Sequence, residues 1–161
     1  MKVIVKEHPK LNLIGLSIKT TLKENKIPEL WIKFIKKMPE IDDITVPQCS
    51  IGLIMEKEIV HFKKDTPFQY MAAKILKKGV RSPEGFEKFT IPGGLYAVFT
   101  HEGSIDNLSE LYDYIYNVWF SASVFNKRKG YEFEWYDSRY KYNDPQTKID
   151  IHIPVERAFT V

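Results

Sequence analysis

Cysteine is almost absent from this chain, since Cys49 is the only one among 161 residues. A single cysteine excludes an intramolecular disulfide and suits a reducing compartment. The four histidines show no close paired spacing, so a structural zinc site is not expected either. We therefore predict no metal, and we interpret Cys49 as a buried apolar residue.

Long hydrophobic runs and glycine-rich phosphate loops are also missing. The N-terminal residues alternate between apolar and charged side chains, and no run reaches the length of a signal peptide or a membrane helix. Neither GxxxxGK nor GxGxxG occurs, and Pro92-Gly93-Gly94 fits a tight turn between two strands. The sequence thus predicts a cytoplasmic protein with no membrane association and no cofactor.

Charge of either sign is nearly balanced. Lys and Arg number 24 against 21 Asp and Glu, which gives a net charge of +3, and basic residues are interleaved with acidic ones. Nucleic-acid-binding domains usually carry a basic stripe, so we expect no direct DNA binding. The nearest basic cluster, Lys127-Arg128-Lys129, is interpreted as a solvated loop between a helix and a strand.

What the sequence does contain is a pair of amphipathic helices. Apolar residues recur at helical spacing over residues 27–38 and again over 105–119. We expect Pro39 to end the first helix and Ser104 or Asp106 to cap the second.

Strand patterns surround both helices in the same order, with two strands before each helix and two after it. The predicted strands are residues 2–6, 11–20, 49–55, 68–76, 86–91, 95–101, 131–137 and 148–155. Pro154 is expected to close the last one. We predict an α+β fold in which residues 1–161 form a single domain of two ββαββ repeats, about 1–80 and 81–161, related by a pseudo-twofold axis. A ligand cleft between antiparallel sheets is expected where the halves meet.

One predicted strand, with the sequence YEFEWYD, carries the best candidates for chemistry. Alternation puts Glu132, Glu134 and Tyr136 on one face, and a carboxylate beside a phenol can pair with a cation or supply a general base and a hydrogen-bond donor. If the final strand is a neighbour, the polar residues of both strands could form one cluster: Glu134, Tyr136, Asp150 and His152. The alternative is that both polar faces are solvent-exposed.

Aromatic residues make up 14% of the chain and concentrate in segments that should flank the cleft. Most of them are expected in the core. A cleft with aromatic walls and one buried carboxylate would nevertheless suit a flat cation, through stacking, cation–π attraction and charge pairing. The aromatic candidates for ligand binding are Tyr70, Phe99, Tyr112, Tyr116 and Trp119.

A series of motifs resembles the gyrase-inhibitor-like small-molecule-binding family, also known as the effector-binding domain of AraC-type regulators. The motifs are FQYMA at 68–72, IPGGLYAVF at 91–99, HEG at 101–103, YDYIY at 112–116 with Trp119, FEWY at 133–136 and IHIP at 151–154. The resemblance spans more than half of the chain and implies a duplicated strand-helix-strand fold.

The resemblance also implies roles for particular residues. In the family, the Glu of a Phe-Glu-x-Tyr motif lies in the ligand cavity, and the matching residue here is Glu134. Tyr70 resembles a strand tyrosine of the family, whereas His152 replaces its tyrosine before Ile-Pro. The helix aromatics near the pocket are matched by Tyr112, Tyr116 and Trp119. AraC-type regulators carry a separate DNA-binding region, which we do not expect in this chain.

Three functions stay open. The first is a stand-alone binding protein of the multidrug type for lipophilic aromatic or cationic compounds, with Glu134 as the counter-charge. The second, implied by the resemblance, is a hydrolase that opens cyclopropane rings of alkylating toxins, with Glu134 as general base and Tyr136 as donor. The third is an interaction protein that inhibits DNA gyrase. Whether the chain forms a homodimer is left open.

Overall fold

A computed structural model describes residues 2–58 and 63–159. Their strands are β1 (Lys2–His8), β2 (Leu11–Thr20), β3 (Ser50–Ile54), β4 (Phe68–Ile75), β5 (Glu87–Ile91), β6 (Gly94–Glu102), β7 (Phe125–Lys127), β8 (Phe133–Tyr136) and β9 (Lys148–Arg157). The α-helices are α1 (Ile27–Lys37), α2 (Leu108–Tyr114) and α3 (Phe120–Ala122). No helix in this described part is both long and apolar enough to cross a membrane.

The strands form one antiparallel sheet in the order β1-β6-β9-β8-β3-β4-β2-β5, and β7 pairs with the outer part of β9. The predicted α+β class is therefore confirmed. Each pairing in the first half has a counterpart in the second, since β2–β4 corresponds to β6–β9 and β3–β4 to β8–β9. The contact between β3 and β8 joins the halves. This order agrees with the pseudo-twofold duplication that we propose.

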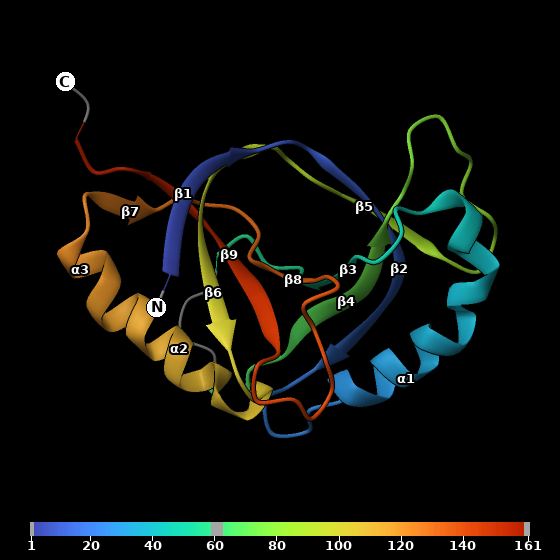
Figure 1. Ribbon diagram of the computed structural model, residues 1–161, viewed down its shortest axis with the longest axis horizontal. Helices are drawn as coiled ribbons and strands as arrows, with labels where there is room; N and C mark the ends of the chain where they lie inside the picture. Colours follow the sequence, from blue (N-terminus) through green and yellow to red (C-terminus); the bar gives the residue numbers. More distant parts are fainter. Residues whose placement is uncertain (1, 59–62, 160–161) are drawn as a thin grey trace.

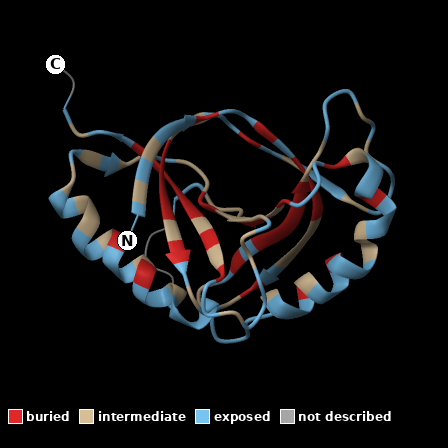
Figure 2. Ribbon diagram, in the orientation of Figure 1, coloured by how far each residue is buried: buried red, intermediate tan, exposed pale blue. Residues whose placement is uncertain are grey.

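Both long helical segments lie on the same side of the curved sheet. Figure 1 shows α1 at one end and α2 with α3 at the other, while β8 and β3 occupy the middle of the sheet. Buried residues concentrate in the strands, and the outer sides of the helices are exposed (Figure 2). The centre of the sheet therefore lies between the two helical segments.

The helix α1 forms because its apolar residues recur every three or four positions and because its ends suit the helix dipole. Pro28 is in the first turn with Glu29, and Lys36 and Lys37 occupy the last turn. Pro39 ends the α-helix as predicted, because α1 stops at Lys37 and Met38 is its C-cap. The chain continues as a 3₁₀ helix, Met38–Ile44, with Pro39 in its first turn, where no backbone donor is required.

The second helical segment changes its hydrogen-bonding pattern along its length. The Ser104 hydroxyl accepts from the Asp106 amide at 3.1 Å, which confirms the predicted cap. A short 3₁₀ turn leads into α2, and a π-helical stretch, Ile115–Trp119, separates α2 from α3. Such π-helical stretches frequently occur at functional sites because they re-aim the side chains that follow.

Two expectations about β9 and its surroundings were wrong. Pro154 does not close the strand, because its carbonyl accepts from the Arg128 amide at 3.0 Å and β9 continues to Arg157. The basic cluster is not a solvated loop either. The Arg128 guanidinium donates to the Leu95 carbonyl at 2.9 Å and lies 5.2 Å from the Tyr96 ring centre, so this residue is a structural part of the sheet.

The core divides into three clusters. One lies beneath α1 and includes Phe34 and Tyr70, and one lies beneath α2 and includes Phe99 and Ile151. The third fills the opposite face of the sheet, and the predicted burial of Cys49 is confirmed there. Burial raises the pKa of its thiol to about 12, so it is not a nucleophile at neutral pH.

Candidate ligand-binding site

Glu134 lies on β8 at the centre of the sheet, on the helical side. Its Oε1 accepts a hydrogen bond from the Tyr70 hydroxyl of β4 at 2.7 Å. That hydroxyl in turn accepts from Nε1 of Trp31 on α1 at 3.1 Å. The Tyr136 hydroxyl, on the same strand, also hydrogen bonds to Glu134. Three aromatic side chains from three different elements thus converge on one carboxylate.

Gly52 on β3 makes this convergence possible, because β3 runs between β4 and β8. Gly52 is directly opposite Glu134 in the register. A Cβ atom at this position would lie 2.1 Å from the Tyr70 hydroxyl and 2.3 Å from Oε1 of Glu134. The absence of a side chain at Gly52 lets the phenol reach the carboxylate across the intervening strand.

Glu134 is a buried carboxylate with no positively charged neighbour paired to it among the described residues. Burial raises its pKa above the usual value, while hydrogen bonds from Tyr70 and Tyr136 act in the opposite direction. None of the ion pairs found among the described residues includes Glu134. Among the described residues, only phenols stabilise the charge of this carboxylate, so it can accept either a proton or a cation.

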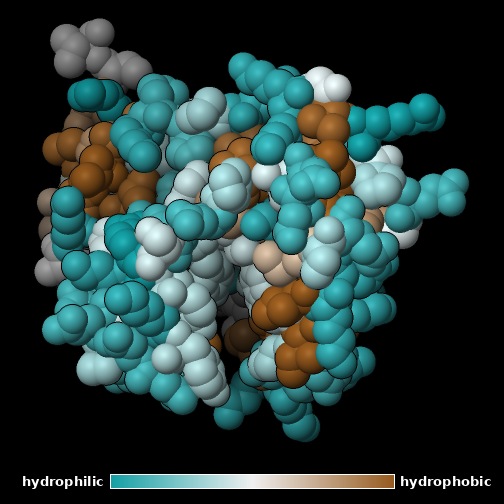
Figure 3. Space-filling model, turned by 45° about the vertical axis from the view of Figure 1, so that its right-hand side comes forward, coloured by the Kyte–Doolittle hydropathy of each residue, from teal (hydrophilic) through white to brown (hydrophobic). Residues whose placement is uncertain are grey.

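Half-buried aromatic rings stand around the carboxylate. The rings of Trp31 and Tyr136 meet edge to face with centroids 5.7 Å apart, and Tyr140 packs against Tyr136 at 5.1 Å. The charge of Glu134 also raises the pKa of the Tyr112 phenol on α2, after the larger effect of burial. In the view turned so that α1 comes forward, the surface has a hollow beside hydrophobic side chains (Figure 3).

Comparison with known proteins identifies the family. The model of the GyrI-like small molecule binding domain matches residues 1–156. The chain belongs to this family. The GyrI-like domain is 28% identical over 156 residues to the transcriptional regulator BrlR of Pseudomonas aeruginosa. That match covers 96% of this chain and 56% of BrlR, so the domain spans little more than half of the regulator's length.

Two solved structures share the fold of this GyrI-like domain. The structure of SAV2435 bound to tetraphenylphosphonium has a TM-score of 0.74 at 15% identity, and the match covers 97% of this chain and 94% of that one. A hydrolase encoded by lin2189 of Listeria innocua has a TM-score of 0.61 at 11% identity, over 96% and 92% of the two chains. At such identities the likeness shows the fold alone.

The structure of the GyrI-like domain brings some of the predicted site residues together and separates others. Tyr70 and Tyr136 hydrogen bond to Glu134, and Tyr112 interacts with it electrostatically. Phe99 and Trp119 instead pack on each other at 5.0 Å in the core beneath α2, where Phe99 is fully buried. Their packing gives both residues a role in the core beneath α2.

The predicted cluster of Glu134, Tyr136, Asp150 and His152 is wrong. The strands β8 and β9 are neighbours, but the register places Glu134 opposite Ile151. Asp150 and His152 therefore lie on the other face of the sheet. There Asp150 accepts from Thr100 at 2.7 Å and forms an ion pair with Arg139 at 2.6 Å.

His152 belongs to an aromatic cluster on that other face. Its ring stacks on Phe133 with centroids 4.3 Å apart and meets His8 edge to face at 5.3 Å. Burial lowers its pKa to about 3, so the imidazole is neutral over the physiological range. We therefore exclude His152 from the Glu134 site.

Trp31 is a site neighbour that was not among the predicted ligand-binding residues. Glu132 was not among them either, although alternation had placed it on the face of Glu134. Trp31 is on α1, whereas the motifs pointed to aromatic residues of the second helix. Glu132 is 1% exposed, and its Oε1 accepts from the Tyr116 hydroxyl at 2.5 Å. The position of Trp31 in its own amphipathic stripe was a usable signal, because it matches Trp119 in the other repeat.

The burial of Glu132 predicts a pH-dependent stability. Its pKa is raised from 4.5 to about 7 by burial, against opposing effects of Tyr116 and Lys127. A raised folded-state pKa contributes stability below pH 4.5 that is lost as the pH rises through 7. The free energy of unfolding of the wild-type protein should fall by on the order of 3 kcal/mol between pH 5 and 8. In Glu132→Gln this fall should be absent, and urea unfolding at the two pH values measures it. An unchanged difference between the two pH values would show that Glu132 titrates normally.

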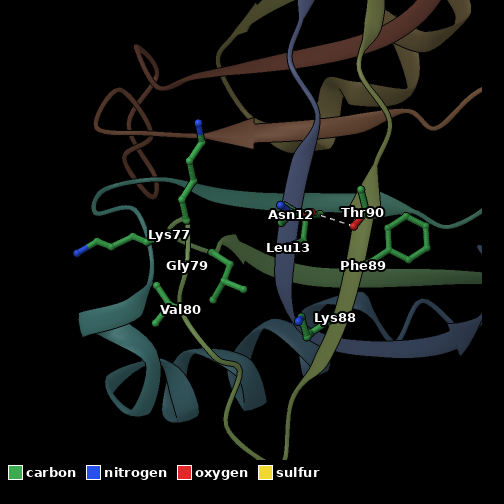
Figure 4. A pocket seen from close by; sticks show the side chains of 10 residues that line it. Asn12, Leu13, Lys77, Gly79, Val80, Lys88, Phe89 and Thr90 are labelled. Atoms are coloured by element: carbon green, nitrogen blue, oxygen red, sulfur yellow. Dashed lines mark hydrogen bonds between the residues drawn. The ribbon is translucent and has the colours of Figure 1, made fainter.

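Two cavities of the GyrI-like domain lie away from Glu134. One, of about 240 Å³, is beside the hydrogen bond that Thr90 donates to Asn12 at 2.9 Å (Figure 4). The other, of about 190 Å³, is next to Arg128. The lysines of the first are exposed and neither cavity contains a buried charge, so we place the ligand site at Glu134. Across residues 2–58 and 63–159 no three metal-ligating side chains come together.

Proposed function

We propose that this small-molecule-binding domain is a multidrug-type protein that accommodates lipophilic aromatic cations beside Glu134. The observation that carries the proposal is a carboxylate surrounded by aromatic rings and lacking any cationic partner among the described residues. A bound cation would pair with the carboxylate and contact the faces of Trp31 and Tyr136. The complex of SAV2435 with tetraphenylphosphonium, a lipophilic aromatic cation, supports the choice of ligand class.

A matched pair of probes tests the charge preference. Tetraphenylphosphonium and tetraphenylborate have nearly the same shape and opposite charge. We expect the cation to bind at least about 100-fold more tightly than the anion, because the anion would meet an uncompensated carboxylate in a desolvated site. Isothermal titration calorimetry with both probes measures the ratio. Equal affinities would mean that the site selects shape and hydrophobicity alone.

Hydrolysis is the second candidate function. The carboxylate with two phenols at hydrogen-bonding distance could activate water as general base and donate to a leaving group, and Glu134 and Tyr136 would have these roles. The fold shared with the lin2189 hydrolase favours testing it. Mass spectrometry after incubation with a cyclopropane-bearing electrophile decides, since turnover that is lost in Glu134→Gln would establish an enzyme.

Location and other partners are also part of the proposal. We propose that the protein is cytoplasmic. We also propose that it does not itself contact DNA, because its net charge of +3 is small and its basic residues are interleaved with acidic ones. BrlR is a transcriptional regulator, and the domain matches little more than half of it. We found no particular feature that favours gyrase inhibition over ligand binding.

A further inference from the structure

Glu132 is a buried carboxyl group that the proposed function does not use. Its side chain is 1% exposed, and Oε1 is bonded to the Tyr116 hydroxyl. Its Oε2 is buried and has no hydrogen-bond partner among the described residues. A buried carboxyl oxygen without a hydrogen-bond partner is energetically unfavourable. Accepting a hydrogen bond from a ligand at Oε2 would therefore be favourable.

The spacing of Glu132 and Glu134 places both carboxyl groups on one face. Residues i and i+2 of an extended chain point the same way, and their Cα atoms are about 7 Å apart. The charges of Glu134 and Glu132 both raise the pKa of the Tyr112 phenol, after the larger effect of burial. Tyr70 binds one of the two carboxyl groups and Tyr116 binds the other, both on the helical side of the sheet.

The groups that face Glu132 do not neutralise it. Tyr112 and Tyr116 approach it from the second helical segment as uncharged phenols. Lys127 at the end of β7 acts on it through space, but its Nζ donates to the Arg128 carbonyl at 3.1 Å. The ion pairs among the described residues include none between Lys127 and Glu132.

We propose that Glu132 is a second acidic subsite of the Glu134 site, and that the preferred ligands are elongated aromatic molecules with two basic nitrogens about 7 Å apart. This inference rests on the proposed function. One nitrogen pairs with Glu134, and the other donates to Oε2 of Glu132. Access requires Tyr112 or Tyr116 to turn aside. Both side chains are half-buried, and the π-helical stretch Ile115–Trp119 interrupts the α-helical hydrogen bonding at Tyr116.

Two amines of the same shape test the second subsite. The diamine 1,4-bis(aminomethyl)benzene carries two cationic groups, and 4-ethylbenzylamine, in which a methyl group replaces one ammonium group, carries one. Their affinities are measured by competition with tetraphenylphosphonium. We expect the diamine to bind at least about tenfold more tightly to the wild-type protein. In Glu132→Gln this ratio should fall to about one, because the amide carries no charge.

Controls separate this proposal from the function on which it rests. Glu110→Gln removes an exposed charge from α2 and should keep the ratio. A ratio near one in the wild-type protein, the same ratio in Glu132→Gln, or no competition by either amine overturns the second subsite. Failure of tetraphenylphosphonium itself to bind at Glu134 would overturn the proposed function instead.

A measurement on the wild-type protein guards against a Glu132→Gln variant that does not fold. Burial raises the pKa of Glu132 to about 7, so both protonation states are populated near pH 7. Binding of the diamine should therefore release more protons than binding of the monoamine, because the second ammonium group favours the charged form of Glu132. Calorimetry in two buffers of different ionisation enthalpy measures this difference. Equal proton release for the two amines would contradict the subsite.

Discussion

Replacing Glu134 by glutamine is expected to lower the affinity for tetraphenylphosphonium about 100-fold, because the cation would lose its counter-charge in a half-buried aromatic site. Truncating one partner of a desolvated charge pair costs about 2–5 kcal/mol, and about 2.7 kcal/mol corresponds to 100-fold. Glutamine keeps the size of the side chain and can still accept the hydrogen bond that Tyr70 donates. Isothermal titration calorimetry at pH 7.5 measures the change.

The matched control is Glu110→Gln, which removes an exposed carboxylate from α2 and should change the affinity less than about twofold. In the wild-type protein the affinity should fall as the pH is lowered, because burial raises the pKa of Glu134 and protonation removes the charge that binds the cation. This pH dependence should be much weaker in Glu134→Gln. Equal affinities of the two proteins would show that the cation binds elsewhere.

Gly52→Ala is expected to destabilise the domain by about 1–3 kcal/mol and to abolish cation binding. The new Cβ would lie 2.1 Å from the Tyr70 hydroxyl and 2.3 Å from Oε1 of Glu134, so one or both side chains must leave their positions. Urea unfolding measures the first effect. Titration with tetraphenylphosphonium, at a temperature where the variant is folded, measures the second.

A double-mutant cycle shows whether the clash with Tyr70 is the cause. Tyr70→Phe removes the hydroxyl that the new Cβ would meet, so Gly52→Ala should cost at least about 0.5 kcal/mol less in that background. Part of the cost should persist, because Cζ of Tyr70 is 3.1 Å from the Cβ position and Glu134 is unchanged. Strictly additive costs would mean that the two residues do not interact.

The sequence was sufficient for the elements whose signals are local. The helical stripes of residues 27–38 and 105–119 predicted both helical segments, because the spacing of apolar residues depends only on helix geometry. The Ser104 cap was likewise readable from its place before the second stripe. The continuation of the strand past Pro154 could not be predicted, because it depends on the hydrogen bond that the Pro154 carbonyl accepts from the Arg128 amide.

The site was less predictable because it is assembled across strands. Alternation showed that Glu134 and Tyr136 share a face, but the face of Asp150 and His152 relative to them follows from the β8–β9 register. A shift of one residue exchanges the faces, and nothing local in either strand fixes that shift.

Gly52 and Trp31 are two site residues whose contact partners could not be predicted from the sequence. A glycine within a strand is a common signal for close approach of another group, but the sequence does not say which group approaches. Here the group is the Tyr70 hydroxyl, which passes beside Gly52 and donates a hydrogen bond to Glu134. Trp31 reaches that hydroxyl from α1 in the same half of the chain. The contact between Tyr70 and Glu134 joins the two halves, so only their packing creates it.

A crystal structure of the domain with tetraphenylphosphonium tests the account most directly. We predict the phosphorus atom within roughly 6 Å of the Glu134 carboxylate, with phenyl rings against Trp31, Tyr112 and Tyr136. A cation bound beside Arg128 or on the outer surface of a helix, with Glu134 still bonded only to its phenols, would contradict it.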